Sequence, residues 1–210
     1  MSLIMSIDVE TTGIDLTGED KSKVISLGAV VMPMDTRQPP YELEVFLDVF
    51  GETQSRYINW DSKALQMNLG TLTRIKELSK NPPGEDSITC LIESQSEFGG
   101  VLWQFINHVQ REEDNNEKIV LLGKNLALFD IPMLGDTLLN MVGEGGLAYS
   151  VIDIGNLYLR PEDNGKVPCL DECVKRAGWS REVPHTALGD AKLVMELYRQ
   201  WCRSTNHSTK

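Results

Sequence analysis

Residues 7–13 read Ile-Asp-Val-Glu-Thr-Thr-Gly, and they follow directly on an apolar run at 3–7 in which a serine is the single polar residue. This composition is typical of a buried β-strand. Because side chains alternate along a strand with a period of two, Asp8 and Glu10 point to one side while Ile7 and Val9 point to the other. The stretch therefore predicts a strand that ends in a pair of acidic side chains on one face.

The carboxylates of Asp8 and Glu10 need a compensating charge if they are buried. Two like charges side by side repel each other, and burying even one of them costs free energy. A divalent cation supplies the compensation, because carboxylate oxygens are the preferred ligands of Mg²⁺, Mn²⁺ and Ca²⁺. Taken alone, a D-x-E pattern is also typical of a solvated strand end. Further motifs in the chain are needed to distinguish a metal site from an ordinary surface feature.

The bulk properties predict one globular domain without a membrane span. The chain has 210 residues, of which 41% are hydrophobic, and no apolar run approaches the ~20 residues that a membrane helix needs. The N-terminus lacks the basic and long apolar segments of a secretory signal, and the four cysteines are scattered without zinc-binding spacing. We therefore expect a cytoplasmic protein without disulfides.

The net charge of −11 restricts how the chain could bind nucleic acid. It excludes a general coat protein that works by neutralising phosphates with basic side chains. It leaves open an enzyme whose own metal ions bridge substrate phosphates, because such ions are the largest local charges.

The hydrophobic pattern predicts an α/β domain with a central mixed sheet flanked by helices. Apolar segments at 24–31 and 41–50 predict two further strands, which short loops would join to the first in an antiparallel three-strand meander. Later strands are expected at 118–122 and 151–154. Helices are expected at 62–69, 71–80, 96–111, 131–141, 170–178 and 186–203, with Asp61 and Asp130 as N-caps and Gly70 and Gly178 as stops. The domain would span residues 1–203, with a polar tail at 204–210.

The second informative stretch reads Pro-His-Thr-Ala-Leu-Gly-Asp at residues 184–190. His185 and Asp190 are five residues apart, so on one helix they would point ~140° apart. They face one site only if His185 lies before the helix, on a loop fixed by Pro184, with Asp190 in an early turn. A histidine there suits a general base, because its ordinary pKa of ~6.5 allows proton uptake near neutrality. A hydrogen-bonded surface histidine is the alternative for His185 taken alone.

Three motifs, in order, resemble those of the DnaQ-like 3′→5′ exonucleases with four acidic residues and a histidine, the DEDDh family. The first motif, D-x-E-T-T-G, is found at residues 8–13, the second, N-x-x-x-F-D, at 125–130, and the third, H-x-A-x-x-D, at 185–190. The resemblance covers roughly residues 5–200 and implies a ribonuclease H-like fold. The first motif departs from the D-x-E-M-T-G form of oligoribonucleases, which disfavours a dinucleotide specialist.

The resemblance implies a site with two divalent ions, Mg²⁺ or Mn²⁺, held by carboxylates. Asp8 would bridge both ions, Glu10 and Asp190 would hold the ion that carries the attacking water, and Asp130 would support the site directly or through water. His185 would take the proton from that water as the general base.

The resemblance also implies contacts with the terminal nucleotide of the substrate. Glu10 and the backbone of the first motif would anchor the 3′-hydroxyl, and an apolar side chain would pack near the terminal base. The residues expected to bind substrate are Thr11, Thr12, Gly13, Leu27, Asn125 and Phe129. A plain core position is an equal alternative for Phe129. For residues 60–68, contact with penultimate nucleotides and a core-packing helix remain equally open.

The expected activity is hydrolysis of phosphodiester bonds from the 3′ end of single-stranded DNA or RNA, with release of nucleoside 5′-monophosphates. The alternative is an exonuclease-like module that binds nucleic-acid ends or a partner protein and has little catalytic power. Loss of a carboxylate would favour that alternative, and none is lost. The sequence leaves the choice between DNA and RNA open, because it does not reveal contacts to a 2′-hydroxyl. The oligomeric state, a homodimer included, is equally open.

Overall fold

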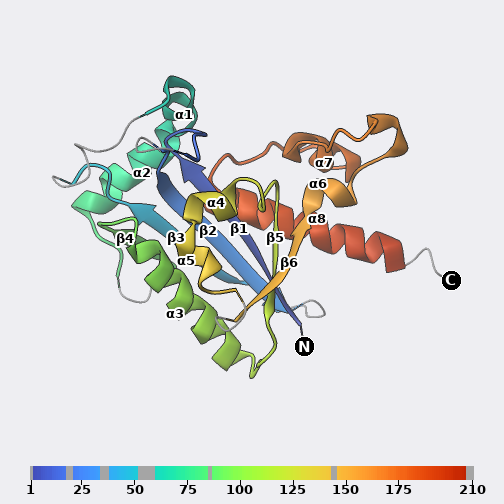
Figure 1. The fold of residues 1–210 in the computed structure, drawn as a ribbon, viewed down its shortest axis with the longest axis horizontal. Coiled ribbons are helices and arrows are strands. Elements are labelled where there is room, and N and C mark those ends of the chain that lie inside the picture. The colour runs from blue at the N-terminus through green and yellow to red at the C-terminus, as the bar shows by residue number, and fades with distance from the viewer. Residues whose placement is uncertain are drawn as a thin grey trace.

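A six-stranded mixed β-sheet forms the centre of the computed structural model, in the strand order β4-β3-β2-β1-β5-β6 (Figure 1). The structure describes residues 2–17, 21–33, 38–51, 60–84, 87–142 and 146–206. The strands are β1 (Leu3–Thr11), β2 (Val24–Pro33), β3 (Tyr41–Leu47), β4 (Thr89–Ile92), β5 (Ile119–Gly123) and β6 (Leu147–Asp153).

The first three strands form the antiparallel meander that the sequence predicts. β1 pairs antiparallel with β2, and β2 pairs antiparallel with β3. β5 then joins the other side of β1 in parallel, and β6 joins β5 in parallel. This arrangement places β1 at the centre of the sheet, and its C-terminal end carries Asp8 and Glu10. The α/β fold with a mixed sheet is thus confirmed.

β4 is a strand that the sequence analysis missed. It pairs in parallel with β3 at the edge of the sheet, and it is four residues long. Its two central residues are only half-buried, so it shows neither the length nor the alternation that identifies a strand from sequence.

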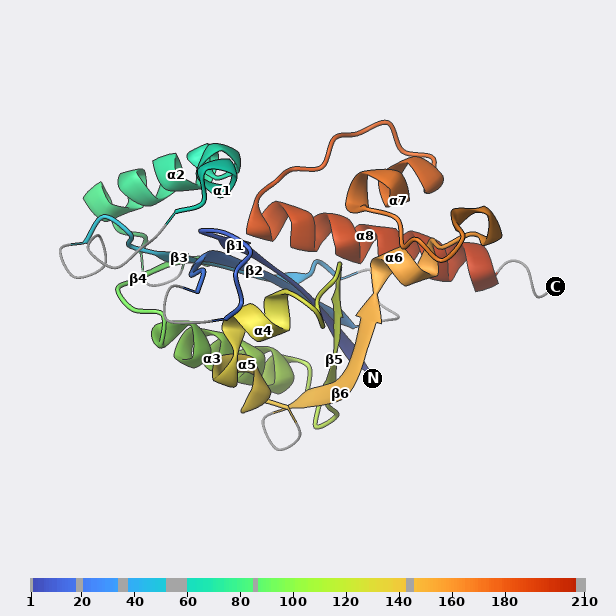
Figure 2. The same cartoon turned by 45° about the horizontal axis from the view of Figure 1, so that its top comes forward.

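Helices cover both faces of the sheet (Figure 2). The long helix α8, with the short helices α6 and α7 beside it, lies on one face, and α3, α4 and α5 lie on the other. The helices are α1 (Ser62–Met67), α2 (Leu69–Lys80), α3 (Glu97–Glu112), α4 (Asp130–Leu134), α5 (Asp136–Leu139), α6 (Ile154–Leu157), α7 (Leu170–Arg176) and α8 (Ala187–Asn206). A 3₁₀ turn spans Pro161–Asp163.

Two hydrophobic clusters, one on each face of the sheet, form the core. Alternation along β1 divides its side chains between them: Met5, Ile7 and Val9 belong to the cluster under α3, whereas Ile4 belongs to the cluster under α8. Asp8 and Glu10 follow the parity of Ile4, so they lie on the α8 face of the sheet. The face that α8 covers is therefore the face on which the acidic pair stands.

Several predicted boundaries are wrong in detail. The expected helix at 131–141 is two short helices, because Gly135 adopts a left-handed φ of 54° between α4 and α5. Asp130 is the first residue of α4 instead of its N-cap, which is Phe129. Gly70 lies inside α2, and Asn68 ends α1. α8 runs on to Asn206, into the expected tail, and residues 207–210 lie outside the described part of the chain.

Two predicted helix ends are confirmed. Asp61 caps α1, because its side chain accepts hydrogen bonds from the backbone N–H groups of Lys63 and Ala64. Gly178, two residues after α7, has the left-handed φ of 78° that commonly ends a helix. The four cysteines are free thiols. In the described part of the chain, no helix is both long and apolar enough to cross a membrane.

Candidate active site

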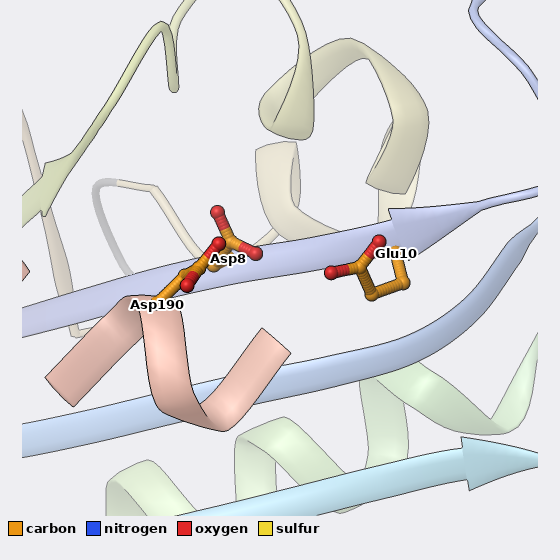
Figure 3. A group of neighbouring side chains, drawn as sticks. All are labelled: Asp8, Glu10 and Asp190. Atoms are coloured by element: carbon orange, nitrogen blue, oxygen red, sulfur yellow. The ribbon is translucent and has the colours of Figure 1, made fainter. Parts of the chain in front are cut away.

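Three carboxylates from two distant parts of the sequence meet at the C-terminal end of β1. Asp8 and Glu10 stand on one face of the strand, and Asp190 reaches them from the first turn of α8 (Figure 3). One ligand oxygen from each of Asp8, Glu10 and Asp190 lies within 4.8 Å of the others. Among the described residues, this is the only group of three or more His, Cys, Asp or Glu side chains close enough to hold one metal ion. We call it the carboxylate cluster.

Glycine at position 28 allows α8 to approach so closely. Gly28 is paired with Asp8 across β1 and β2, so the two residues share a face of the sheet. A β-carbon at Gly28 would lie 2.2 Å from the backbone N of Leu188 and 2.3 Å from the carbonyl carbon of Ala187. The first turn of α8 therefore rests on the bare backbone of β2, which brings Asp190 beside Asp8.

Asp130, the fourth predicted carboxylate, is buried beside the carboxylate cluster. Its Oδ1 accepts a hydrogen bond from the backbone N–H of Val9 at 3.0 Å, which ties the start of α4 to β1 between the two acidic residues. Its charge is close enough to raise the pKa of both Asp8 and Glu10. Asp130 thus adjoins the cluster without being one of the three carboxylates that converge on a single point.

The electrostatics of the site oppose four ionised carboxylates. Burial, followed by the neighbouring charges, raises the pKa of Asp8 well above its ordinary value and raises that of Glu10 to about 7. Burial raises the pKa of Asp130 to about 7, although the hydrogen bond from Val9 acts in the opposite direction. Burial also raises the pKa of Asp190. A bound cation would reverse these shifts, because opposite charge favours the ionised form.

His185 lies just before α8, as predicted, on the loop that follows α7. It is exposed, and its backbone has a left-handed φ of 54°, which is uncommon for a residue other than glycine. Its backbone N–H donates to Oδ1 of Asp190 at 3.1 Å. Gly189 leaves room for this loop, since a β-carbon there would lie 2.5 Å from Oγ1 of Thr186 and 2.6 Å from Cβ of Pro184. The loop thus ties His185 to the carboxylate cluster through its backbone.

The threonines of the first motif shape the loop after β1. Thr11 and Thr12 are buried. Oγ1 of Thr11 donates to the carbonyl oxygen of Gly13 at 2.6 Å, and Oγ1 of Thr12 accepts from the backbone N–H of Lys23 at 2.9 Å. A β-carbon at Gly13 would lie 2.8 Å from Oγ of Ser22. Both hydroxyl groups are therefore used within the protein, and any contact with substrate would come from the backbone of this loop.

The other three predicted substrate-binding residues lie in different surroundings. Leu27 is completely buried in the cluster under α3, and it is paired with Val9, on the face of the sheet opposite to Asp8. It is a core residue that presents no exposed surface in this structure. Phe129 is half-buried and packs against the same cluster. Asn125 is exposed, and its φ of 57° begins the turn that leads into α4.

An ion pair beside the site was not identified from the sequence. Nζ of Lys124 lies 3.8 Å from Oδ1 of Asp153, at the end of β6, and donates to Oδ1 of Asn125 at 2.6 Å. Oδ2 of Asp153 accepts from the backbone N–H of Asn125 at 2.7 Å, and its Oδ1 accepts from that of Gly155 at 2.7 Å. The turn that presents Asp130 is therefore fastened to the neighbouring strand. A carboxylate two residues before a glycine at a strand end was the available signal.

The α1–α2 junction is attached to the same strand end. Nδ2 of Asn68 donates to the carbonyl oxygen of Thr11 at 3.1 Å. The backbone N–H of Asp61 donates to the carbonyl oxygen of Thr12 at 2.9 Å. α1 has no buried residue, and Leu65 and Met67 are exposed. Of the two alternatives for residues 60–68, core packing is thus seen for Trp60 and not for α1.

No protein-family model and no curated protein sequence matches the chain. Solved structures do match by fold. Exonuclease I of E. coli in a zinc-bound complex with single-stranded DNA has a TM-score of 0.61 at 15% identity, over 98% of this chain and 41% of that one. Exonuclease I from Methylocaldum szegediense has a TM-score of 0.62 at 16% identity, and the match covers 98% of this chain and 41% of that one. The E. coli enzyme in complex with a dA16 oligonucleotide has a TM-score of 0.61 at 15% identity, and the match covers 99% of this chain and 42% of that one.

These matches establish the fold. The chain spans about two fifths of the length of the exonuclease I structures that it matches. The ribonuclease H-like α/β fold that the motifs imply is confirmed, and it is the fold of exonuclease I.

Proposed function

We propose that this chain is a metal-dependent 3′→5′ exonuclease of the DEDDh type that acts on single-stranded nucleic acid. The observation that carries the proposal is the convergence of Asp8, Glu10 and Asp190 within 4.8 Å, with the buried Asp130 beside them. Structural ion pairs place opposite charges together, whereas this site places like charges together and raises their pKa values. The shared fold with exonuclease I supports the same reaction class.

The side chains present fit a divalent cation site. All four are carboxylates, which are the ligands that Mg²⁺ and Mn²⁺ prefer, and the three of the carboxylate cluster come from two rigid elements. Asp8, Glu10 and Asp190 would hold the cations, and Asp130 would support them. Two such ions would supply neutralisation of the phosphate charge and a lowered pKa for the attacking water.

His185 supplies the proton acceptor in this proposal. Its side chain is exposed at the edge of the carboxylate cluster, and its backbone is held by Asp190 at 3.1 Å. A ring nitrogen of neutral imidazole accepts the proton of the attacking water, and the adjacent carboxylate stabilises the imidazolium that results. The water oxygen forms the new bond to phosphorus, and the 3′-oxygen of the preceding nucleotide leaves. The product is a nucleoside 5′-monophosphate.

The substrate is a single strand with a free 3′ end. Glu10 and the backbone of residues 11–13 would anchor the terminal 3′-hydroxyl, and Asn125 and Phe129 lie on the turn that leads to Asp130. Exonuclease I is seen in complex with single-stranded DNA oligonucleotides, which favours DNA as the first polymer to test. RNA is the second polymer to test, because recognition of the 2′-hydroxyl is what separates the two.

The test is digestion of matched 5′-labelled single-stranded DNA and RNA with Mg²⁺ or Mn²⁺. We expect a ladder that shortens from the 3′ end and that is lost both in EDTA and in an Asp8→Asn variant. The relative rates on the two polymers identify the preferred sugar. Cleavage that persists in Asp8→Asn after repurification would show that the carboxylate cluster is not the active site. Binding of both polymers without cleavage would move the function to a module that holds nucleic-acid ends.

A further inference from the structure

A cavity outside the carboxylate cluster lies between α8 and the segment 177–186 that joins α7 to α8. It has a volume of ≈ 410 Å³, within the range of ~300–1,000 Å³ that is common for small-ligand sites. Its lining residues are Trp179, Glu196, Arg199, Gln200 and Arg203. We call it the α8 arginine site.

The α8 arginine site occupies the side of α8 that faces away from the sheet. Glu196, Arg199 and Arg203 are spaced by three and four residues, so they form one stripe along the helix. Arg199 follows Asp190 by nine residues, which turns the helix by ~180° relative to the direction of the catalytic carboxylate. The site is therefore separate from the carboxylate cluster although both are built on the same helix.

The charge of the α8 arginine site contrasts with that of the chain as a whole. Residues 1–153 contain 11 Lys and Arg against 24 Asp and Glu, whereas residues 154–210 contain nine against seven. Glu196 is the acidic member of the lining, and it forms an ion pair with Arg181. The guanidinium of Arg181 in turn lies 4.3 Å from the centre of the Trp179 ring. The cavity thus combines a positive lining with an aromatic ring.

This chemistry matches a phosphodiester strand. The guanidinium group offers a planar fork of donors that fits phosphate oxygens in a bidentate manner. Aromatic rings and arginine planes are the surfaces on which unpaired bases stack in single-strand binding sites. An acidic protein would use the same charges, but it would make no use of a stacking surface.

The distance between the two sites suits one continuous strand. Arg199 and Arg203 follow Asp190 by nine and 13 residues along α8, which corresponds to ~13.5 Å and ~20 Å of helix. The segment that borders the cavity at Trp179 continues directly to His185. These rises are lower bounds on the path, because the two sites face opposite sides of α8. At roughly 3.4 Å per nucleotide, a strand therefore needs more than ~4 nucleotides to reach Arg199 and more than ~6 to reach Arg203.

We propose that the α8 arginine site binds phosphates in the 5′-ward part of the single strand whose 3′ end lies at the carboxylate cluster. The inference rests on the proposed function, since it takes the same strand as the ligand. Although the chain as a whole is acidic, the arginines of this site would attract the phosphates of the strand at a distance from the metal site.

Binding in EDTA tests the proposal without cleavage. The probes are 5′-fluorescein-labelled (dT)4 and (dT)16, measured by anisotropy between ~50 and ~200 mM salt, a range over which phosphate contacts are resolved. We expect Arg199→Gln/Arg203→Gln to weaken binding of (dT)16 roughly tenfold, and to reduce the slope of log affinity against log salt by ~1.4, the amount for two phosphate contacts. Binding of (dT)4 should change less than about twofold, because it reaches only the carboxylate cluster.

Two matched variants complete the design. Lys76→Gln/Lys80→Gln removes the same charge from the exposed side of α2 and should leave both probes unaffected. Arg199→Lys/Arg203→Lys keeps the charge and should restore the salt slope. An equal loss for (dT)4 and (dT)16, an equal loss in the α2 variant, or no loss at all would each overturn the site.

The result also separates this site from the activity. A wild-type protein that cleaves DNA but binds (dT)16 no more tightly than (dT)4 overturns the α8 arginine site and leaves the exonuclease intact. Displacement of (dT)16 by poly-glutamate at equal charge concentration, without loss of (dT)4 binding, would assign the cavity to an acidic protein segment and overturn the proposal. Length-dependent binding without cleavage supports the site and counts against the exonuclease.

Discussion

Two clusters of charged side chains lie on the α8 side of the sheet, and they differ in the balance of their charges. Around Arg176, the guanidinium donates to both oxygens of Asp163, at 2.6 and 2.7 Å, and to Glu172 at 2.9 Å. The bonds from Arg176, followed by the hydrogen bond from the backbone N–H of Arg160, lower the pKa of Asp163 to about 2. At the end of β1, Asp8 and Glu10 stand beside further carboxylates, and their pKa values are raised.

The contrast indicates what each cluster is for. The Arg176 cluster satisfies itself, since every charge has a partner within the fold, and it fastens the 3₁₀ turn to α7. The carboxylate cluster has no positive side chain among its three members, and in the proposed function a cation supplies the missing charge. Charge balance therefore separates a structural network from a functional site, and substitutions in the two clusters should have opposite consequences.

The largest effect is expected from Asp8→Asn. The side chain keeps its shape and loses the charge that adjoins Glu10, Asp130 and Asp190, so we expect nuclease activity to fall by roughly 10³-fold or more. Because the lost charge is repelled by its neighbours, the metal-free protein should become more stable. Activity on labelled DNA and thermal unfolding in EDTA measure the two changes. A variant that is both inactive and less stable would place Asp8 in a structural role instead.

The next largest effect is expected from Gly28→Ala. The added methyl group would occupy the space of the α8 backbone at Leu188, so the first turn of α8 has to move away from β2. A displacement of about 1 Å at reacting groups costs up to ~10²-fold in rate, and we expect a loss of that size together with weaker binding of Mn²⁺, measured by calorimetry.

Gly100→Ala is the control for this backbone contact. Gly100 lies in α3, and a β-carbon there has no heavy atom within 4 Å. Alanine is the better helix former by ~1 kcal/mol, so this variant should gain stability and keep full activity. Equal activities of Gly28→Ala and Gly100→Ala would show that contact between α8 and β2 does not position Asp190.

The local motifs were predictable from sequence because each one lies within seven residues, where the period of a strand or the start of a helix fixes the direction of the side chains. Asp8 and Glu10 follow from the alternation of β1, and the position of His185 before α8 follows from Pro184 and the five-residue spacing to Asp190. These are statements about single elements.

What remained unpredictable depends on contacts between elements. β2 is buried along its whole length on both faces, so its sequence carries no alternation that tells Leu27 from Gly28. The register with β1 decides that Gly28 faces α8 and that Leu27 enters the core. The pairing of Lys124 with Asp153 depends equally on the parallel alignment of β5 and β6. Such information resides in the assembled sheet.

A smaller effect, confined to stability, is expected from Arg176→Met. This change leaves Asp163 without its bidentate partner, although the hydrogen bond from the backbone N–H of Arg160 remains. We expect the unfolding temperature to fall while the specific activity of the folded protein stays unchanged. Arg74→Met is the matched control, because Arg74 forms an exposed pair with Glu77 at 3.7 Å and such pairs contribute little. If Arg176→Met lost activity at a temperature where it is still folded, the Arg176 cluster would contribute to the activity of the carboxylate cluster, and the separation of the two would be wrong.

The last prediction is a pH dependence of stability with opposite signs in the two clusters. In metal-free protein, Glu10 and Asp130 have pKa values of about 7 when folded and ordinary values near 4 when unfolded. Their protonated forms favour the folded state, so this stability is complete below pH ~4 and is lost as the pH rises to 7. Asp163, with a folded pKa of about 2, stabilises the fold above pH ~4 and loses that contribution as the pH falls toward 2.

Urea unfolding in EDTA between pH 2 and 8 should therefore show a maximum of stability between the two limbs. Glu10→Gln/Asp130→Asn should make the limb above pH 5 shallower and leave the acidic limb in place, because two of the four carboxylates with raised pKa values are gone while Asp163 is untouched. Mn²⁺ at pH 7.5 should raise the stability of the wild type by binding the ionised cluster, and should have little effect on the double variant. Stability that rises steadily from pH 5 to 8 in EDTA would mean that these carboxylates are not crowded in the folded protein, and it would remove the physical reason for assigning them to a cation.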